Sequence, residues 1–158
     1  MDNDKQTFLA HFDREFATTK NVIAAFSDAK LDFKPEGKLR TAKEILGIFP
    51  ATEMSLPSFA QGKTPAEWTP YAAETVKDIL SGFERGHKEA LEAIKGTSAA
   101  DLQEQMDFWG TPMRRIDALW VMLLDNIHHR GQMTVYLRAM GEVVPSVYGP
   151  TAEKSMGA

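Results

Sequence analysis

The sequence predicts an all-α fold, a four-helix bundle of the up-down kind with long connections between its helices. Three long stretches repeat apolar residues every three or four positions, as helices with one buried face do. A fourth stretch opens on a helix-capping pattern, and Gly and Pro residues separate all four. The chain has 158 residues, of which 43 % are hydrophobic, so we expect one domain over 1–158. Residues from about 142 to 158 are expected to form a tail that packs on the bundle and frays at its end.

The first long stretch predicts a helix from Asp4 to Phe33, ending before Pro35. One face of this helix is mainly apolar and rich in phenylalanine: Phe8, Phe12, Phe16, Thr19, Ile23 and Phe26. Such a stripe is typical of a helix that packs into a bundle core.

Thr41 and Glu44 form a capping box that predicts the start of a second helix. Pro50 and Pro57 interrupt the helical pattern, so we expect a kink or an early end. Glu53 is expected to be an exposed acid, unless a kink turns its carboxylate inward as a ligand.

A loop is predicted over residues 61–70, with Trp68 as either a lid over a pocket or a cap on the core. A third helix is predicted from Ala72 to Lys95. His87 lies inside its apolar stripe, either as a buried neutral histidine or as a pocket residue. A short helical piece capped by Ser98 is expected to follow, and then a turn at residues 108–110.

The longest predicted helix runs from Thr111, as its N-cap, to Gly141, as its C-terminal cap. One face is apolar or small and should pack on the bundle: Ile116, Trp120, Leu123, Leu124, Ile127, Gly131 and Thr134. The opposite face carries a polar line with two methionines beside it: Asp125, His129, Gln132 and Tyr136, with Met122 and Met133. Both faces look covered, which predicts a homodimer or a pocket.

Asp125 and His129 stand one helical turn apart, so their side chains can approach a single metal ion. The alternative is a local hydrogen-bonded pair that holds the helix face in place.

Composition excludes several function classes. The net charge is −4 and no basic run occurs, so a nucleic-acid surface is not indicated. No run of 18 apolar residues and no signal peptide is found, which predicts a cytoplasmic protein without membrane contact. The absence of cysteine excludes disulfides, a thiolate nucleophile and a cysteine-ligated zinc site.

The segments HHRGQMTVYLRAMG and VVPSVYGPTA resemble the C-terminal signature of the DinB/YfiT-like family. The resemblance implies a four-helix bundle, a homodimer and a metal site of three histidines. In that family one histidine follows a pattern like E-L-L-x-H in the second helix, and two form H-x-x-x-H-R-G-Q in the last helix. Here His129 matches the last of these histidines, Asp125 replaces the one before it, and Ile48 replaces the one in the second helix.

Two functions follow as expectations. The first is a metal-dependent enzyme, a thiol-using transferase or hydrolase with zinc or nickel on Asp125 and His129, as the resemblance implies. The second is a metal-free bundle that binds a small molecule or serves in stress responses. In either case the expected pocket comprises Ile48, His87, Met122, Gln132, Met133 and Tyr136.

Overall fold

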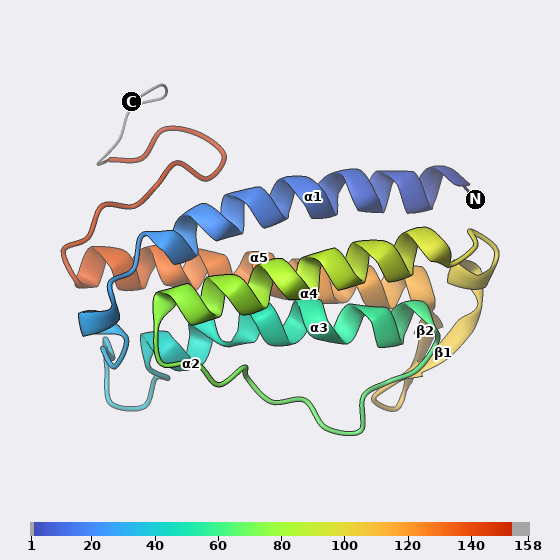
Figure 1. Cartoon of the computed structure of the whole chain (residues 1–158), viewed down its shortest axis with the longest axis horizontal. Helices are drawn as coiled ribbons and strands as arrows, with labels where there is room; N and C mark the ends of the chain where they lie inside the picture. The colour runs from blue at the N-terminus through green and yellow to red at the C-terminus, as the bar shows by residue number, and fades with distance from the viewer. Residues whose placement is uncertain (1, 153–158) are drawn as a thin grey trace.

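The computed structural model describes residues 2–152, and most of them are helical (Figure 1). In chain order the elements are α1 (Asp2–Ala24), η1 (Asp28–Lys30), α2 (Ala42–Leu46), α3 (Ile48–Ala60), α4 (Val76–Gly96), η2 (Asp101–Gln103), β1 (Gln105–Phe108), β2 (Thr111–Arg114) and α5 (Arg115–Ala139). Four long helices, α1, α3, α4 and α5, lie side by side in Figure 1. The expectation of a mainly helical fold is confirmed, whereas a small two-stranded sheet was not predicted.

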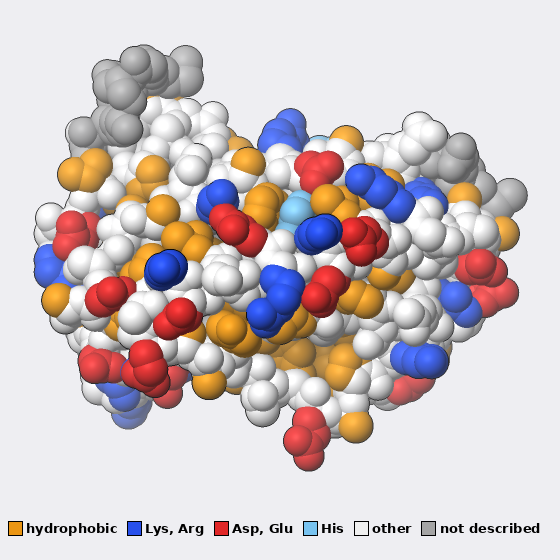
Figure 2. Space-filling model, viewed as in Figure 1, with side chains coloured by type: hydrophobic (Ala, Val, Ile, Leu, Met, Phe, Trp, Pro, Cys, Tyr) orange, Lys and Arg blue, Asp and Glu red, His pale blue; other side chains and the backbone are white. Residues whose placement is uncertain are grey.

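The expected up-down order is wrong, because α3 and α4 run parallel (Figure 1). The loop 61–75 returns along the length of α3 before α4 begins. At one end of the molecule the Thr64 hydroxyl donates to the backbone oxygen of Asp107. At the other end the Tyr71 N–H donates to the carbonyl of Gly47, at 2.8 Å. Hydrophobic side chains gather in the hollow between α4 and this loop (Figure 2).

Gly86 lets α3 and α4 pack closely. A Cβ atom at this position would lie 2.9 Å from the Cβ of Glu53 and 3.2 Å from the Met54 side chain. Real Cβ contacts are not that short, so a larger residue would push the two helices apart. The close approach brings the side chains of Glu53 and His87 within reach of each other.

The break between α2 and α3 lies at Gly47, three residues before Pro50. The capping box of Thr41 and Glu44 is confirmed in both of its hydrogen bonds. Pro50 lies in the first turn of α3, where a backbone N–H makes no intrahelical hydrogen bond. The lack of an N–H on proline therefore costs this helix no hydrogen bond. Pro57 lies inside the same helix, so neither proline ends it.

Three other predicted boundaries need correction. The third predicted helix begins at Val76, with the Thr75 side chain as its N-cap, rather than at Ala72. The first helix ends at Ala24 rather than at Phe33, and the short η1 follows it. The last helix begins at Arg115 rather than at Thr111, because Thr111–Arg114 forms strand β2. Its end is as predicted: Gly141 has φ +74°, and the Glu142 N–H donates to the Leu137 carbonyl, as in a Schellman cap.

The β1–β2 hairpin turns through Trp109 and Gly110, which lie between the paired residues Phe108 and Thr111. Both turn residues have positive φ, +47° at Trp109 and +87° at Gly110, as a type I′ turn requires. Asn is the usual first residue of such a turn, since its side chain tolerates the left-handed region. A tryptophan there is strained and half exposed, at 46 %.

Arg130 is buried among α1, α5 and the tail. Its guanidinium lies 2.7 Å from Glu15 Oε2 and donates to the Thr19 hydroxyl at 3.1 Å. The Tyr148 hydroxyl donates to the same Glu15 carboxylate at 2.7 Å, and its ring lies 5.0 Å from the Arg130 Cζ. This network and the buried Val144 hold residues 144–148 against the bundle. The predicted fraying falls on residues 153–158, outside the described residues.

Within the described residues, no helix has the length and apolar character needed to cross a membrane.

Candidate functional site

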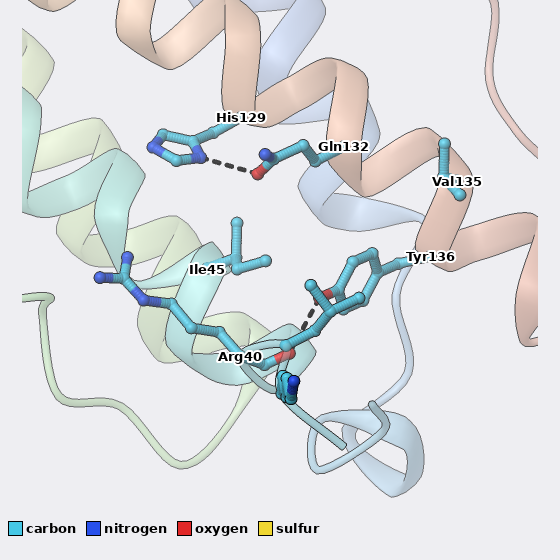
Figure 3. Close-up of a pocket in the computed structure, with 8 residues that line it drawn as sticks. Arg40, Ile45, His129, Gln132, Val135 and Tyr136 are labelled. Atoms are coloured by element: carbon cyan, nitrogen blue, oxygen red, sulfur yellow. Dashed lines mark hydrogen bonds between the residues drawn. The ribbon is translucent and has the colours of Figure 1, made fainter. Parts of the chain in front are cut away.

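A pocket of about 500 Å³ opens between α2, α5 and the segment before α2 (Figure 3). We call it the cationic pocket, and its walls are Lys38, Leu39, Arg40, Ile45, His129, Gln132, Val135 and Tyr136. Its position follows from the fold: the capping box starts α2 directly after Arg40, and α5 presents residues 129–136 across from it. In Figure 3 the His129 ring and the Arg40 guanidinium lie at one end, with Tyr136 at the other.

Both ring nitrogens of His129 have partners. Nδ1 lies 2.9 Å from Gln132 Oε1, and Nε2 lies 3.5 Å from Asp125 Oδ2. The Gln132 amide nitrogen donates to the ring of His128, at 3.1 Å, which leaves the Gln132 oxygen to accept from His129. His129 therefore donates through Nδ1 and faces a carboxylate through Nε2, an arrangement that favours the doubly protonated, positively charged ring.

The pKa shifts of Asp125 and His129 both favour the charged forms of the two side chains. The hydrogen bond with Asp125 raises the pKa of His129, against the effects of burial and of the Arg40 charge. The hydrogen bond from His129 likewise lowers the pKa of Asp125, although burial opposes it. Because Lys38 and Arg40 add two permanent positive charges, the pocket is cationic when His129 is protonated.

Tyr136 closes the far end of this pocket. Its hydroxyl donates to the backbone carbonyl of Arg40, at 2.9 Å, so it ties α5 to the segment that carries Arg40. Burial raises the pKa of Tyr136, and the Glu44 charge adds to that effect. The phenol is therefore neutral and acts as a positioning group for the pocket wall.

A second hollow, of about 520 Å³, lies beside Asp125. We call it the aromatic hollow, and its walls are Trp68, Phe108, Trp109, Val121, Met122 and Asp125. They come from the loop 61–75, the hairpin and the first half of α5. Since His129 lines the cationic pocket and Asp125 lines the aromatic hollow, the pair lies between the two.

The residues present do not fit a three-ligand metal site. Asp125 and His129 contact each other, and both ring nitrogens of His129 are engaged. At the position of the third family ligand, Ile48 is aliphatic and fully buried. Across the described part of the chain, no group of three or more His, Cys, Asp or Glu side chains is arranged to hold a metal ion. Catalytic zinc sites generally have three protein ligands.

The other predicted pocket residues lie in the core. Ile48 and Met133 are fully buried, and His87 is 5 % exposed between helices. The predicted faces of α5 are also partly wrong. Leu124 and Gly131, expected to pack, are exposed, whereas Met122, Met133 and Tyr136 on the other face are buried.

A buried Glu53–His87 pair, which continues to the exposed carboxylate of Asp13, was missed. His87 Nδ1 lies 3.3 Å from Glu53 Oε2, and His87 Nε2 lies 3.0 Å from Asp13 Oδ1. The ring stacks on Phe16, with centroids 3.8 Å apart. The expectation that Glu53 is exposed is wrong, because its side chain is almost fully buried against α4. The sequence signal was His87 within an apolar stripe, which called for a buried polar partner.

Lys38 and Arg40 were also missed. They lie in an exposed segment without periodicity, and only the capping box beside them predicts that this segment meets a helix.

Comparisons with known proteins agree with the fold. A model of the DinB family matches residues 1–156. The uncharacterized protein YrdA of Bacillus subtilis is 34 % identical over 94 residues, which are 58 % of this chain and 55 % of that protein. The chain thus matches only about half the length of this curated relative.

Solved structures show the same fold. A DinB-like protein from Bacillus cereus matches with a TM-score of 0.78 and 27 % identity, over 90 % of this chain and 97 % of that one. The DinB-like protein YjoA from Bacillus subtilis matches with a TM-score of 0.72 and 18 % identity, over 95 % and 99 % of the two chains. A mycothiol-dependent maleylpyruvate isomerase matches with a TM-score of 0.66 and 10 % identity, over 82 % of this chain and 60 % of that one, which shows likeness of fold alone.

Together with the HHRGQ segment on α5, the match over residues 1–156 assigns the chain: it belongs to the DinB family.

Proposed function

We propose that this DinB-family protein binds a small organic anion in the cationic pocket, without a metal ion. The ligand class follows from the pocket walls. A carboxylate or similar acid group pairs with Arg40 and is attracted by the nearby charge of His129 at one end, while an apolar body lies along Ile45, Val135 and Tyr136.

One observation carries the proposal: three cationic side chains, Lys38, Arg40 and His129, line a single pocket. The carboxylate in contact with His129, that of Asp125, is on the side of the aromatic hollow. An anion in the pocket therefore meets Arg40 and Lys38 without a competing acid among the lining residues. A volume of about 500 Å³ suits a molecule the size of a substituted benzoate.

Titration calorimetry with benzoate, and with uncharged benzyl alcohol as its control, tests this proposal. Benzoate is expected to bind saturably and the alcohol much more weakly. Arg40→Gln and His129→Gln should each weaken benzoate binding about tenfold. Arg85→Gln, which removes an exposed arginine of α4, should leave it unchanged. Equal binding of acid and alcohol, or no saturable binding of either, rejects the proposal.

A metal-dependent enzyme, a thiol-using transferase or hydrolase, is the second candidate. It is favoured by the separation of 3.5 Å between His129 Nε2 and Asp125 Oδ2, which one ion could bridge after displacing a proton. The mycothiol-dependent isomerase has a similar fold. Metal analysis after dialysis against zinc, nickel, manganese or iron decides between the two candidates. A stoichiometric ion that His129→Ala abolishes supports the enzyme, and its absence supports metal-free binding.

We also propose that the protein is a homodimer through the exposed face of α5. Val121, Leu124 and Val135 are 40, 56 and 59 % exposed along that face. Large apolar side chains on one exposed helix face favour association. Leu124→Glu is expected to convert a dimer to a monomer in light scattering, and a wild-type monomer at micromolar concentration contradicts this proposal.

A further inference from the structure

We propose that the aromatic hollow is a binding site for a small organic cation, such as an alkylated ammonium group, held by Trp68 and Trp109 with Asp125 beside them. This site is separate from the cationic pocket and does not depend on the proposed anion function.

The first support is the chemistry of the walls. Four of the six lining residues are Trp68, Phe108, Trp109 and Met122, so two indoles, a phenyl ring and a thioether line the hollow. Aromatic faces carry negative potential and attract cations, and alkylated ammonium groups are recognised in such cages. A neutral apolar ligand would need no carboxylate, whereas Asp125 is the one charged residue of this wall.

The second support is the strained position of Trp109. A type I′ turn favours Asn or Gly at this position, yet the chain holds a tryptophan there at φ +47°. The Trp109 ring packs against two phenylalanines, with its centroid 4.7 Å from that of Phe108 and 5.5 Å from that of Phe59. These contacts cover only part of the side chain, because the residue remains 46 % exposed. Strained backbone at an exposed aromatic side chain is typical of ligand-binding positions.

The third support is the state of Asp125. Its ion pair with His129 is 3.5 Å long, looser than the roughly 2.7–2.9 Å of a strong charged hydrogen bond. The Asp125 side chain is also 43 % exposed, so its carboxylate has room for a second partner. A cation seated between the two tryptophans can share this carboxylate with His129.

The probe is choline, and its control is 3,3-dimethylbutan-1-ol, which has the same shape with carbon in place of the charged nitrogen. Indole NMR signals and tryptophan fluorescence of the full chain follow the binding. Choline is expected to bind saturably and about tenfold more tightly than the uncharged isostere. Shifts should appear at Trp68 and Trp109 and not at Trp120, which lies outside the hollow.

Four variants test the assignment. Asp125→Asn should weaken choline binding about fivefold or more, while Glu92→Gln, which removes an exposed carboxylate of α4, should not change it. His129→Gln should strengthen binding, because it removes the competing charge. Trp109→Gly should abolish the preference for choline while the chain stays folded, because glycine suits a positive φ.

Equal affinity for choline and its isostere overturns the proposal, since an apolar groove would then suffice. No saturable choline binding, or unchanged binding by Asp125→Asn, does the same. If Trp109→Gly changes the oligomeric state in light scattering and leaves choline binding intact, the hollow is an interface between copies of the chain and not a cation site.

Discussion

The carboxyl group of Glu53 and the imidazole of His87 meet between α3 and α4, with Glu53 Oε2 3.3 Å from His87 Nδ1. Burial raises the pKa of Glu53 to about 7, although the hydrogen bond and the charge of His87 oppose this shift. Two parallel helices thus contact through a group that titrates near neutrality. The consequence is a stability that depends on pH.

The sign of this dependence is fixed by the raised pKa. Between about pH 4.5 and pH 7 the unfolded chain has lost the Glu53 proton while the folded chain keeps it. The stabilisation from Glu53 is therefore complete below the unfolded pKa and is lost as the pH rises through 7. We expect the free energy of unfolding of the wild type, relative to Glu53→Gln, to fall by up to about 3 kcal/mol between pH 5 and pH 8. Urea titrations of both proteins measure this, and a constant difference across the range contradicts it.

A second prediction concerns the buried ion pair of Arg130 and Glu15. Their side chains are 2 and 6 % exposed, so removal of Arg130 leaves the buried Glu15 carboxylate without its main counter-charge. Arg130→Met is expected to destabilise the protein by about 3–5 kcal/mol. Tyr148→Phe removes one hydrogen bond to Glu15 and should lower the unfolding free energy by only about 1 kcal/mol. Denaturant unfolding gives both values. A smaller loss of unfolding free energy for Arg130→Met than for Tyr148→Phe would contradict the view that the Arg130–Glu15 pair is the main contact of this network.

Two glycines at α5 should respond to alanine in opposite directions. Gly131 lies inside the helix with open space where the methyl group of an alanine would lie, so Gly131→Ala should stabilise the folded chain by about 0.5–1 kcal/mol. Gly141 also has open space around it, but its φ is +74°, so Gly141→Ala should destabilise the chain by about 1 kcal/mol. Thermal melts at dilute concentration test the pair. A loss of stability in Gly131→Ala at high concentration alone indicates that the dimer packs against Gly131.

Anion binding in the cationic pocket should depend on pH. The hydrogen bond with Asp125 holds the pKa of His129 above its usual value, so the ring keeps its charge below that raised pKa and loses it as the pH rises. Benzoate affinity is expected to decrease about three- to tenfold between about pH 6 and pH 9. Calorimetry over this range measures it, with His129→Gln as the control that should show no such decrease. A wild-type profile as flat as that of the variant removes His129 from the anion site.

Local signals in the sequence predicted local structure well. The capping box of Thr41 and the C-terminal glycine cap at Gly141 act within one helical turn, and both are present. The prediction of helix for residues 111–114 was wrong because a threonine followed by proline resembles a helix start. The observed strand depends instead on pairing with residues 105–108. The predicted antiparallel direction of α4 was wrong for a similar reason. Residues 61–75 run back along α3 (Figure 1), and the sequence pattern does not show this long-range packing.

For the candidate site, spacing placed His129, Gln132 and Tyr136 on one face, and the three residues line one pocket. The spacing could not predict that Asp125 lines a different cavity from His129, because the two residues are only one helical turn apart on the same face. The sequence also could not predict which charged side chains are buried. Glu53 contacts His87, 34 residues away, and Arg130 contacts Glu15, 115 residues away. Long-range partners of this kind leave no periodic trace.

The contact between Tyr148 and Glu15 spans 133 residues of chain, and Arg130 is neutralised by the Glu15 carboxylate and donates a hydrogen bond to the Tyr148 hydroxyl. During synthesis on the ribosome, α5 therefore emerges with a guanidinium that lacks part of its cage until residue 148 has left the exit tunnel. A nascent chain that ends before that residue carries a nearly complete helical core with an incompletely solvated cation inside it. Folding of this protein in the cell is accordingly complete only once residue 148 is free to pack against α1 and α5.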